Sequence, residues 1–432
     1  MRSRARDDAR RANIAPSTLD DGGMARARRA VNVNSEGNYE DHRACSFCVR
    51  YVLYLPTDHQ SVRASRREIH TVRIVPPPPE AKTSGLFGVV SGAEDGTVMR
   101  LLYDASRAGG LRLYAPGDVC KHPGGRTVKA LSVFKESDRS YVLCAGGAKE
   151  VLLAFRLAWV RDDAGAWDIK STALVIPKPV DEAGARSWTK GCGYVEPRAE
   201  SAQRIMDVAT YATPSGEMRV LYSTSRGSLN AVAMREDKRG WRTVSSLAFH
   251  TCPTLAVDVL ETSFGAWACS GSTDGAVAVW RLDDSASISP TCIIERAHQS
   301  GVNALCISRS TAEGSFLIVS GGDDQKLRCQ QIVVDAGGAA PSRVAEFGFA
   351  HSSAVRSVWS DGARIITTSV DQRVKFWDIV SNDDEFALVQ REGVVTQAPE
   401  PEAVDVLSST DATDTLTFAV AGRGFEIFTA HR

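Results

Sequence analysis

The stretch His351–Val380, HSSAVRSVWSDGARIITTSVDQRVKFWDIV, decides the fold that this sequence predicts. It reads as three short extended segments, the second of which is the β-branched run Ile365–Ser369. Asp361-Gly362 and Asp371-Gln372 supply turns between these segments. The stretch therefore predicts a small antiparallel sheet in which consecutive strands are neighbours.

Three polar or aromatic residues of this stretch belong together. His351 opens it, Asp371 lies in the second turn, and Trp377 begins the closing Trp-Asp pair. The carboxylate can accept hydrogen bonds from its own turn and from the histidine, and the tryptophan ring covers the buried pair. This arrangement is the signature of one blade of a WD-repeat β-propeller. Because one blade cannot bury both faces of its sheet, the motif predicts further copies.

Further copies are present along the chain. Turn aspartates with similar surroundings stand at four positions: Asp95, Asp274, Asp324 and Asp371. Trp280 follows Asp274 at the same six-residue separation that is found in the first stretch, whereas Gln330 takes this place after Asp324. His298 precedes its copy as His351 does, and both histidines are predicted to be hydrogen-bonded structural residues rather than catalytic bases.

Weaker copies complete the series. Lys149 and Arg226 occupy the aspartate position in two of them, and the last keeps only the small-residue turn 422–424. The seven turns are 47 to 77 residues apart, where a blade repeat takes about 40–45 residues and more with insertions. An ordinary β-sandwich explains strand alternation but not the recurring turn. We therefore predict an all-β, seven-bladed WD-repeat propeller over residues 45–432, since seven blades close a ring.

Composition excludes several classes of protein. The formal net charge is −1, so any contact with nucleic acid must be a local patch, and no DNA partner is expected. No apolar run approaches the roughly 18 residues of a membrane span, so no membrane contact is expected. The ten cysteines lie mostly singly, and Cys45 and Cys48 have no second pair at zinc spacing, which predicts no metal site. A reducing, cytoplasmic location fits this cysteine usage.

The amino-terminal region differs from the rest. Residues 1–44 hold nine arginines and almost no hydrophobic periodicity, so we predict a disordered basic leader. A basic tail that touches RNA is an alternative interpretation, whereas the acidic residues argue against a mitochondrial presequence. The apolar segment 47–55 is predicted to close the ring as the outer strand of the last blade, because that blade runs out of chain after its third strand.

The longest insertion, predicted at 159–201 between the second and third blades, shows little strand patterning. Loops on rigid scaffolds carry recognition residues, so Lys190 and Arg198 are candidate contacts with a partner or RNA. A plain connection without function is the alternative. Further candidates stand in the loops and turns of one face of the disc: Gln299, Ser300, Asp323, Gln325, Gln372 and Arg373.

The sequence contains no recognisable catalytic motif. It has no phosphate-binding glycine-lysine loop, no nucleophile elbow and no metal-binding HExxH helix. Asp162, Asp163 and Lys190 in the long insertion come with no histidine and no nucleophile arrangement. We therefore expect no enzymatic activity, no catalytic residues and no cofactor of the chain's own, and a function based on presenting surfaces.

The order of several segments resembles one WD-repeat family. These segments include STSRGSLNAVAM, ACSGSTDGAVAVWRL, HQSGVNALCI, SGGDDQKL and SVDQRVKFWDI, within residues 69–432. They are similar to the carboxy-terminal propeller of the non-catalytic partner of the methyltransferase that 2′-O-methylates the wobble nucleotide of certain tRNAs. HQSGVN with GGDDQ is the most specific part. Members of the family are usually much longer, with further propellers ahead of this one, so a shortened form is expected here.

The resemblance implies a scaffold rather than an enzyme. The partner methyltransferase would bind S-adenosylmethionine, while this chain would hold that enzyme and help to place the tRNA anticodon loop. The alternative is a generic WD-repeat adaptor, such as a ubiquitin-ligase substrate receptor or a trafficking scaffold, that binds a peptide over the face of the disc.

Overall fold

The structure of the protein is a computed structural model, and it consists almost entirely of strands. It describes residues 28–30, 46–53, 68–104, 117–122, 127–175, 203–235, 240–283, 290–335, 338–382, 385–407 and 415–431.

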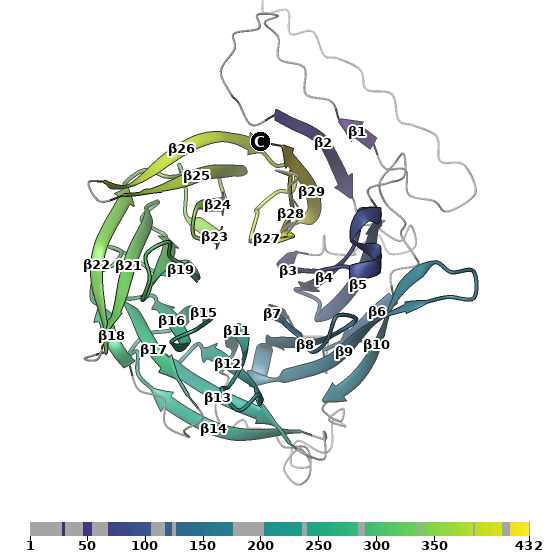
Figure 1. Ribbon diagram of the computed structural model, residues 1–432, viewed down its shortest axis with the longest axis horizontal. Coiled ribbons are helices and arrows are strands. Elements are labelled where there is room, and N and C mark those ends of the chain that lie inside the picture. The colour runs from purple at the N-terminus through teal and green to yellow at the C-terminus, as the bar shows by residue number, and fades with distance from the viewer. Residues whose placement is uncertain are drawn as a thin grey trace, which may run out of the picture.

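Seven antiparallel sheets surround a common axis, as Figure 1 shows. The first blade comprises β3 (Ile69–Val75), β4 (Leu86–Ala93), β5 (Thr97–Asp104) and β6 (Gly117–Lys121). The second comprises β7 (Val128–Lys135), β8 (Ser140–Gly147), β9 (Leu152–Arg161) and β10 (Trp167–Val175). The third comprises β11 (Ile205–Ala212), β12 (Met218–Thr224), β13 (Ser228–Met234) and β14 (Trp241–Ala248).

The next three blades follow the same order. The fourth comprises β15 (Thr254–Thr262), β16 (Gly265–Ser272), β17 (Val277–Leu282) and β18 (Pro290–Ile294). The fifth comprises β19 (Val302–Arg309), β20 (Ser315–Gly322), β21 (Leu327–Asp335) and β22 (Gly338–Phe347). The sixth comprises β23 (Val355–Ser360), β24 (Arg364–Ser369), β25 (Arg373–Ser381) and β26 (Phe386–Val395).

The seventh blade joins both ends of the chain. It comprises β27 (Ala403–Leu407), β28 (Thr415–Gly422), β29 (Gly424–His431), β2 (Ser46–Leu53) and β1 (Arg28–Ala30). Strand β2 corresponds to the segment 47–55 and pairs antiparallel with β29, with Arg50 opposite Phe428. Pairing of an amino-terminal strand with the last blade closes the ring and covers the edge of β29.

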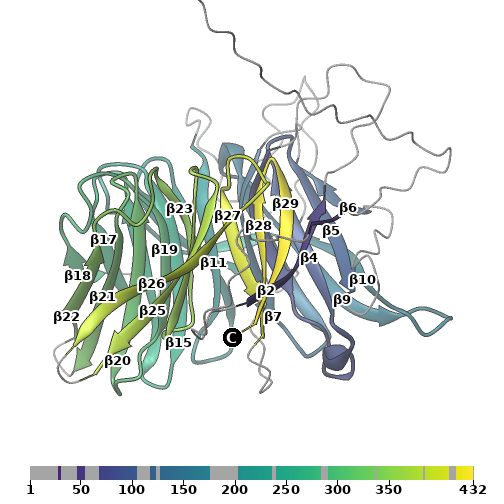
Figure 2. The same ribbon diagram turned by 90° about the horizontal axis from the view of Figure 1, so that it is seen from above.

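The prediction of an all-β, seven-bladed propeller is confirmed. The innermost strand of each blade contacts the innermost strands of both neighbouring blades, and the contact of β27 with β3 completes the circle. Seen edge-on in Figure 2, the strands run between the two faces of the disc. Two 3₁₀ turns, η1 (Pro79–Ser84) and η2 (Ala148–Glu150), are the helical elements of the described residues.

Two predictions about the connections need correction. Residues 159–175 belong to the regular sheet of the second blade, because β9 continues to Arg161 and β10 pairs with it from Trp167. The predicted insertion 159–201 is therefore wrong over its first part, and residues 176–201, with Lys190 and Arg198, lie outside the described residues. Within the leader predicted to be disordered, residues 28–30 form β1 and pair with β2, while the rest of 1–44 is not described.

The hydrophobic core lies between blades rather than within them, because the sheets pack face to face. Trp267 and Phe316 meet across the fourth and fifth blades with ring centroids 5.5 Å apart. Trp377, 1% exposed, meets Phe347 of the preceding blade at 4.9 Å. Each blade thus depends on the next for the burial of its apolar face.

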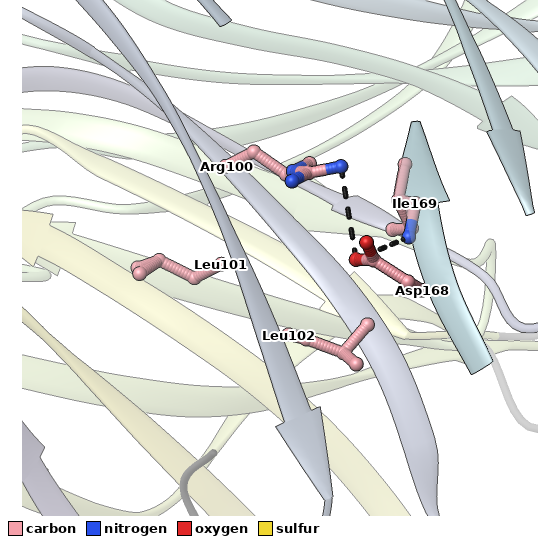
Figure 3. Close-up of a pocket in the computed structure, with 5 residues that line it drawn as sticks. All are labelled: Arg100, Leu101, Leu102, Asp168 and Ile169. Atoms are coloured by element: carbon pink, nitrogen blue, oxygen red, sulfur yellow. Dashed lines mark hydrogen bonds and ion pairs between the residues drawn. The ribbon is translucent and has the colours of Figure 1, made fainter. Parts of the chain in front are cut away.

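Contacts between the first two blades include one small polar site, shown in Figure 3. Arg100 of β5 lies 3.8 Å from the Asp168 carboxylate of β10, which also accepts a hydrogen bond from the Ile169 amide at 2.7 Å. The cavity beside them measures about 10 Å³, room for no more than a water molecule. This ion pair joins two blades and leaves no room for a ligand.

Candidate functional site

In the sixth blade, the predicted residues form a continuous hydrogen-bonded chain. Trp377 Nε1 donates to Thr367 Oγ1 at 3.0 Å, and Thr367 Oγ1 lies 2.7 Å from His351 Nε2. His351 Nδ1 lies 3.0 Å from the Asp371 carboxylate, which also accepts from the Ser352 amide. Because an ionised carboxylate only accepts, Nδ1 carries the proton and Nε2 accepts from the threonine hydroxyl. We call this chain of contacts the histidine lock.

The electrostatics of the lock agree with this assignment. Burial lowers the pKa of His351, although the neighbouring Asp371 opposes the shift. Burial raises the pKa of Asp371, but His351 and the amides of Ser352 and Arg373 outweigh it, so the pKa lies below its usual value. The pair is therefore a neutral imidazole beside a carboxylate, fully engaged in structural hydrogen bonds.

The lock recurs in incomplete form in the two preceding blades. His298 lies 2.9 Å from both Asp324 Oδ1 and Ser320 Oγ, but Gln330 replaces the tryptophan and bonds to the Arg343 carbonyl instead.

In the fourth blade, His250 and Trp280 both bond to Ser270 Oγ. Asp274 accepts from the Ala276 amide and forms no hydrogen bond with His250. In the first blade, Asp95 accepts from the Thr97 amide of its own turn. The turn aspartates therefore share a turn-stabilising role, and within the described residues Asp324 and Asp371 also bond to a histidine.

Each lock also joins two blades. The amide of His298 donates to Gly275 of the fourth blade while its ring bonds to the fifth. His250 was not among the predicted site residues, although its place 24 residues before Asp274 is a usable signal. In the seventh blade, Thr396 and Glu426 take over the role, with Thr396 Oγ1 donating to the Glu426 carboxylate at 2.5 Å. No sequence pattern indicates that substitution.

The predicted contact residues of the fifth and sixth blades lie in the loops and turns that surround these locks. Asp323 accepts from the Asn303 side chain at 2.6 Å, and the Gln299 amide donates to Asp324. Gln325 and Gln372 occupy the left-handed turn position with φ of 67° and 60°. None of the hydrogen bonds within the described residues uses the side-chain amide of either glutamine. Ser300 and Arg373 lie in the same loop and turn as these residues.

A polar cavity of about 590 Å³ runs along the propeller axis. The innermost strands of the first six blades begin with a β-bulge, which turns one side chain toward the axis. The bulged residues, with the equivalent residue of the seventh blade, are His70, Lys129, Met206, Leu255, Asn303, Arg356 and Glu402. Glu402 lies 3.4 Å from Lys129 and 3.8 Å from Arg356, so one carboxylate is shared by the two cations of this ring.

Three buried carboxylates deeper in the cavity have structural partners. Asp207, Asp258 and Asp405 each accept from the backbone amide of an innermost strand in the next blade, at 2.9, 2.9 and 2.6 Å. Burial raises the pKa of Asp258 to about 6, against the hydrogen bonds from the Ile307 and Val259 amides. These carboxylates join blades, and their oxygens are directed at amides rather than at a substrate position.

The described residues contain neither a candidate metal site nor a candidate membrane-spanning helix. No group of three or more histidine, cysteine or acidic side chains there could hold a metal ion. No helix of that part of the chain is long and apolar enough to cross a membrane.

Comparison with known proteins agrees with this geometry. The WD40 family (WD domain, G-beta repeat) matches residues 290–329 and 343–378. Each matched segment runs from the outer strand of one blade into the first three strands of the next, and so includes a histidine lock. These two segments are therefore WD40 repeats.

Solved structures of other proteins share this fold. The chain resembles the RRP9 WD40 repeats at a TM-score of 0.54 and 14% identity, over 86% of this chain and 96% of that one. U3-55K gives 0.53 and 14%, over 85% and 97%. Chaetomium thermophilum Sqt1, bound to the amino terminus of ribosomal protein L10, gives 0.50 and 14%, over 83% of both chains. No curated protein sequence matches this chain.

Proposed function

We propose that this WD40-repeat protein is a non-catalytic scaffold that binds a protein partner through the turns of its fifth and sixth blades. The observation that carries this proposal is the pair Gln325 and Gln372. Equivalent turn positions hold glycine in other blades, as at Gly96 and Gly275. A side chain in the left-handed region costs on the order of 1 kcal/mol, so keeping two glutamines there points to a role for their side chains.

The specific partner we propose is a tRNA 2′-O-methyltransferase. The support is the resemblance of segments such as HQSGVN and GGDDQ to the non-catalytic subunit of the wobble-ribose methyltransferase. The partner would bind S-adenosylmethionine and carry out the reaction. This chain would hold tRNA and enzyme together, and such positioning contributes several kcal/mol of the barrier. Six cysteines between Cys144 and Cys329 are free thiols, which fits the proposed cytoplasmic location.

Mass spectrometry of tRNA tests the proposal. Deleting the gene should remove wobble-ribose 2′-O-methylation, and unchanged methylation would refute the assignment. Re-expression of a Gln325→Gly, Gln372→Gly double variant should keep the fold, because glycine suits this turn position, yet fail to recover the methyltransferase in pull-downs. Arg281→Ala, which removes an exposed side chain of β17 away from these turns, is the matched control.

A second function, a generic protein-interaction adaptor, is favoured by exposed apolar side chains. Phe349, 80% exposed, lies in the loop between the fifth and sixth blades, and Sqt1 shows that a propeller of this fold can bind a peptide. Co-purification from cells distinguishes the two functions. Recovery of a methyltransferase supports the first, whereas recovery of a ubiquitin ligase or a coat complex supports the second.

A further inference from the structure

The turn position that holds aspartate in the locked blades holds a cation in the second and third. Lys149 and Arg226 take this place, and the loop before β11 ends with Arg204. The sequence has no histidine between His122 and His250, so the third blade has no lock that needs a carboxylate. The third-blade turn is therefore free to carry positive charge, whereas the second blade has the buried His122 ahead of its first strand.

The three cations lie close together on one face. Turn η2, which contains Lys149, contacts β11 directly after Arg204. The Arg204 carbonyl accepts from the Ser225 amide at 3.0 Å, one residue before Arg226. All three side chains are exposed. We call Lys149, Arg204 and Arg226 the basic patch.

Charge in the basic patch is largely uncompensated. None of its three side chains forms an ion pair with a described residue. The cation in the seventh-blade turn differs, since Arg423 lies 2.8 Å from Glu400. Glu150 is buried and accepts a hydrogen bond from the Tyr222 hydroxyl, and burial raises its pKa although Tyr222 and the charge of Arg226 oppose the shift. The chain as a whole carries a formal charge of −1, so the patch is a local feature.

The surroundings favour a nucleic-acid backbone over a protein. Among described residues, every exposed large hydrophobic side chain lies in blades four to six: Ile293, Val333, Val344, Phe349 and Val395. Protein interfaces need an apolar centre, whereas binding to phosphates needs exposed lysine and arginine. The basic patch supplies exposed lysine and arginine but no apolar centre.

We propose that the basic patch binds the sugar-phosphate backbone of RNA. The proposal rests on the proposed function and deepens it, because it assigns tRNA to blades two and three and the protein partner to blades five and six. Contacts of this kind position the RNA without reading its sequence. The chain would then bind enzyme and tRNA side by side on one face.

Filter binding of unfractionated tRNA to the full-length chain tests the proposal. The triple variant Lys149→Glu, Arg204→Glu, Arg226→Glu should lose at least about tenfold in affinity at low salt, with a shallower dependence of log affinity on log salt concentration. A matched control, Lys170→Glu, Arg281→Glu, Arg296→Glu, makes the same change of charge at exposed residues outside the patch and should bind nearly as the parent does. Thermal melting and pull-down of the methyltransferase should be unchanged in the patch variant.

Three outcomes overturn the proposal: equal RNA affinity of patch variant and parent, equal losses in the patch and control variants, or loss of a protein partner with RNA binding intact. The last outcome would assign the patch to an acidic protein. Failure of the proposed function gives a different result, because gene deletion would then leave wobble methylation unchanged while the parent still bound RNA through the patch.

Discussion

Blades four to six and blades two and three have the same strand order but are joined by different groups. In the first set, a histidine from the preceding loop bonds to a serine or threonine of the sheet, and in two cases to the turn aspartate. In the second set, buried Glu150 and Tyr222 make the cross-blade contact, and Trp241 donates to the Leu152 carbonyl at 3.1 Å. This difference shows that strand pattern and apolar packing specify a blade. The polar contact that joins a blade to its neighbour can be made by different residues.

The strongest test of the comparison removes the tryptophan of a locked blade. Trp377→Ala deletes a ring that is 1% exposed and leaves a cavity between two blades, so it should cost about 3–5 kcal/mol of unfolding free energy. Denaturant unfolding measures this. Trp167→Ala is the control, since that ring is partly exposed beside Arg161, and it should cost much less. A parent-like midpoint for Trp377→Ala would contradict the packing.

A second test compares the turn position in the two sets. Asp371→Ala removes the acceptor of His351 and of the Ser352 and Arg373 amides, which should cost about 2–3 kcal/mol because buried donors lose their partner. Arg226→Ala at the equivalent position of the third blade should cost under about 0.5 kcal/mol. Equal losses of unfolding free energy in the two variants, measured by chemical denaturation, would show that the histidine lock adds no stability.

Low pH should lower the stability of the protein through His70, a histidine that belongs to none of the locks. Burial, aided by Lys129, lowers the pKa of His70 to about 4 from a usual 6.5. The unfolded chain therefore binds the proton more readily between these values, so stability from His70 is full above pH 6.5 and is lost as pH falls toward 4.

Urea midpoints at about pH 7 and about pH 4.5 check this expectation. His70→Gln should lose less stability than the parent over the interval, because glutamine does not titrate. An identical loss in both proteins would place the acid sensitivity elsewhere, for example in His351, whose pKa burial also lowers.

The smallest effect is expected at the turn glutamines. Gln372→Gly relieves a left-handed backbone strain but adds flexibility to the unfolded chain, and the two effects nearly cancel. The unfolding free energy should stay within about 0.5 kcal/mol of the parent. A loss of about 2 kcal/mol or more in calorimetry would mean that the side chain stabilises the fold, and would remove the argument that it serves a partner.

Much of the fold follows from local pattern. Turns such as Asp371-Gln372 and runs such as Ile365–Ser369 involve neighbours in sequence, so the seven blades can be counted from the order of residues alone. The strand β10 was missed because Trp167–Val175 is largely exposed on its outer face and lacks an apolar alternation. The basic patch was also missed, because Lys149 and Arg226 are 77 residues apart and meet only across a blade interface.

By itself, the sequence determined that this protein is a ring of small sheets with recurring turns, because those features depend on residues a few positions apart. The tertiary structure decided which groups join one blade to the next. Asp405 bonds to the Ile74 amide across 331 residues, and Thr396 with Glu426 replaces a histidine pair. Such contacts depend on how the sheets face one another around the axis, and only the closed ring sets that arrangement.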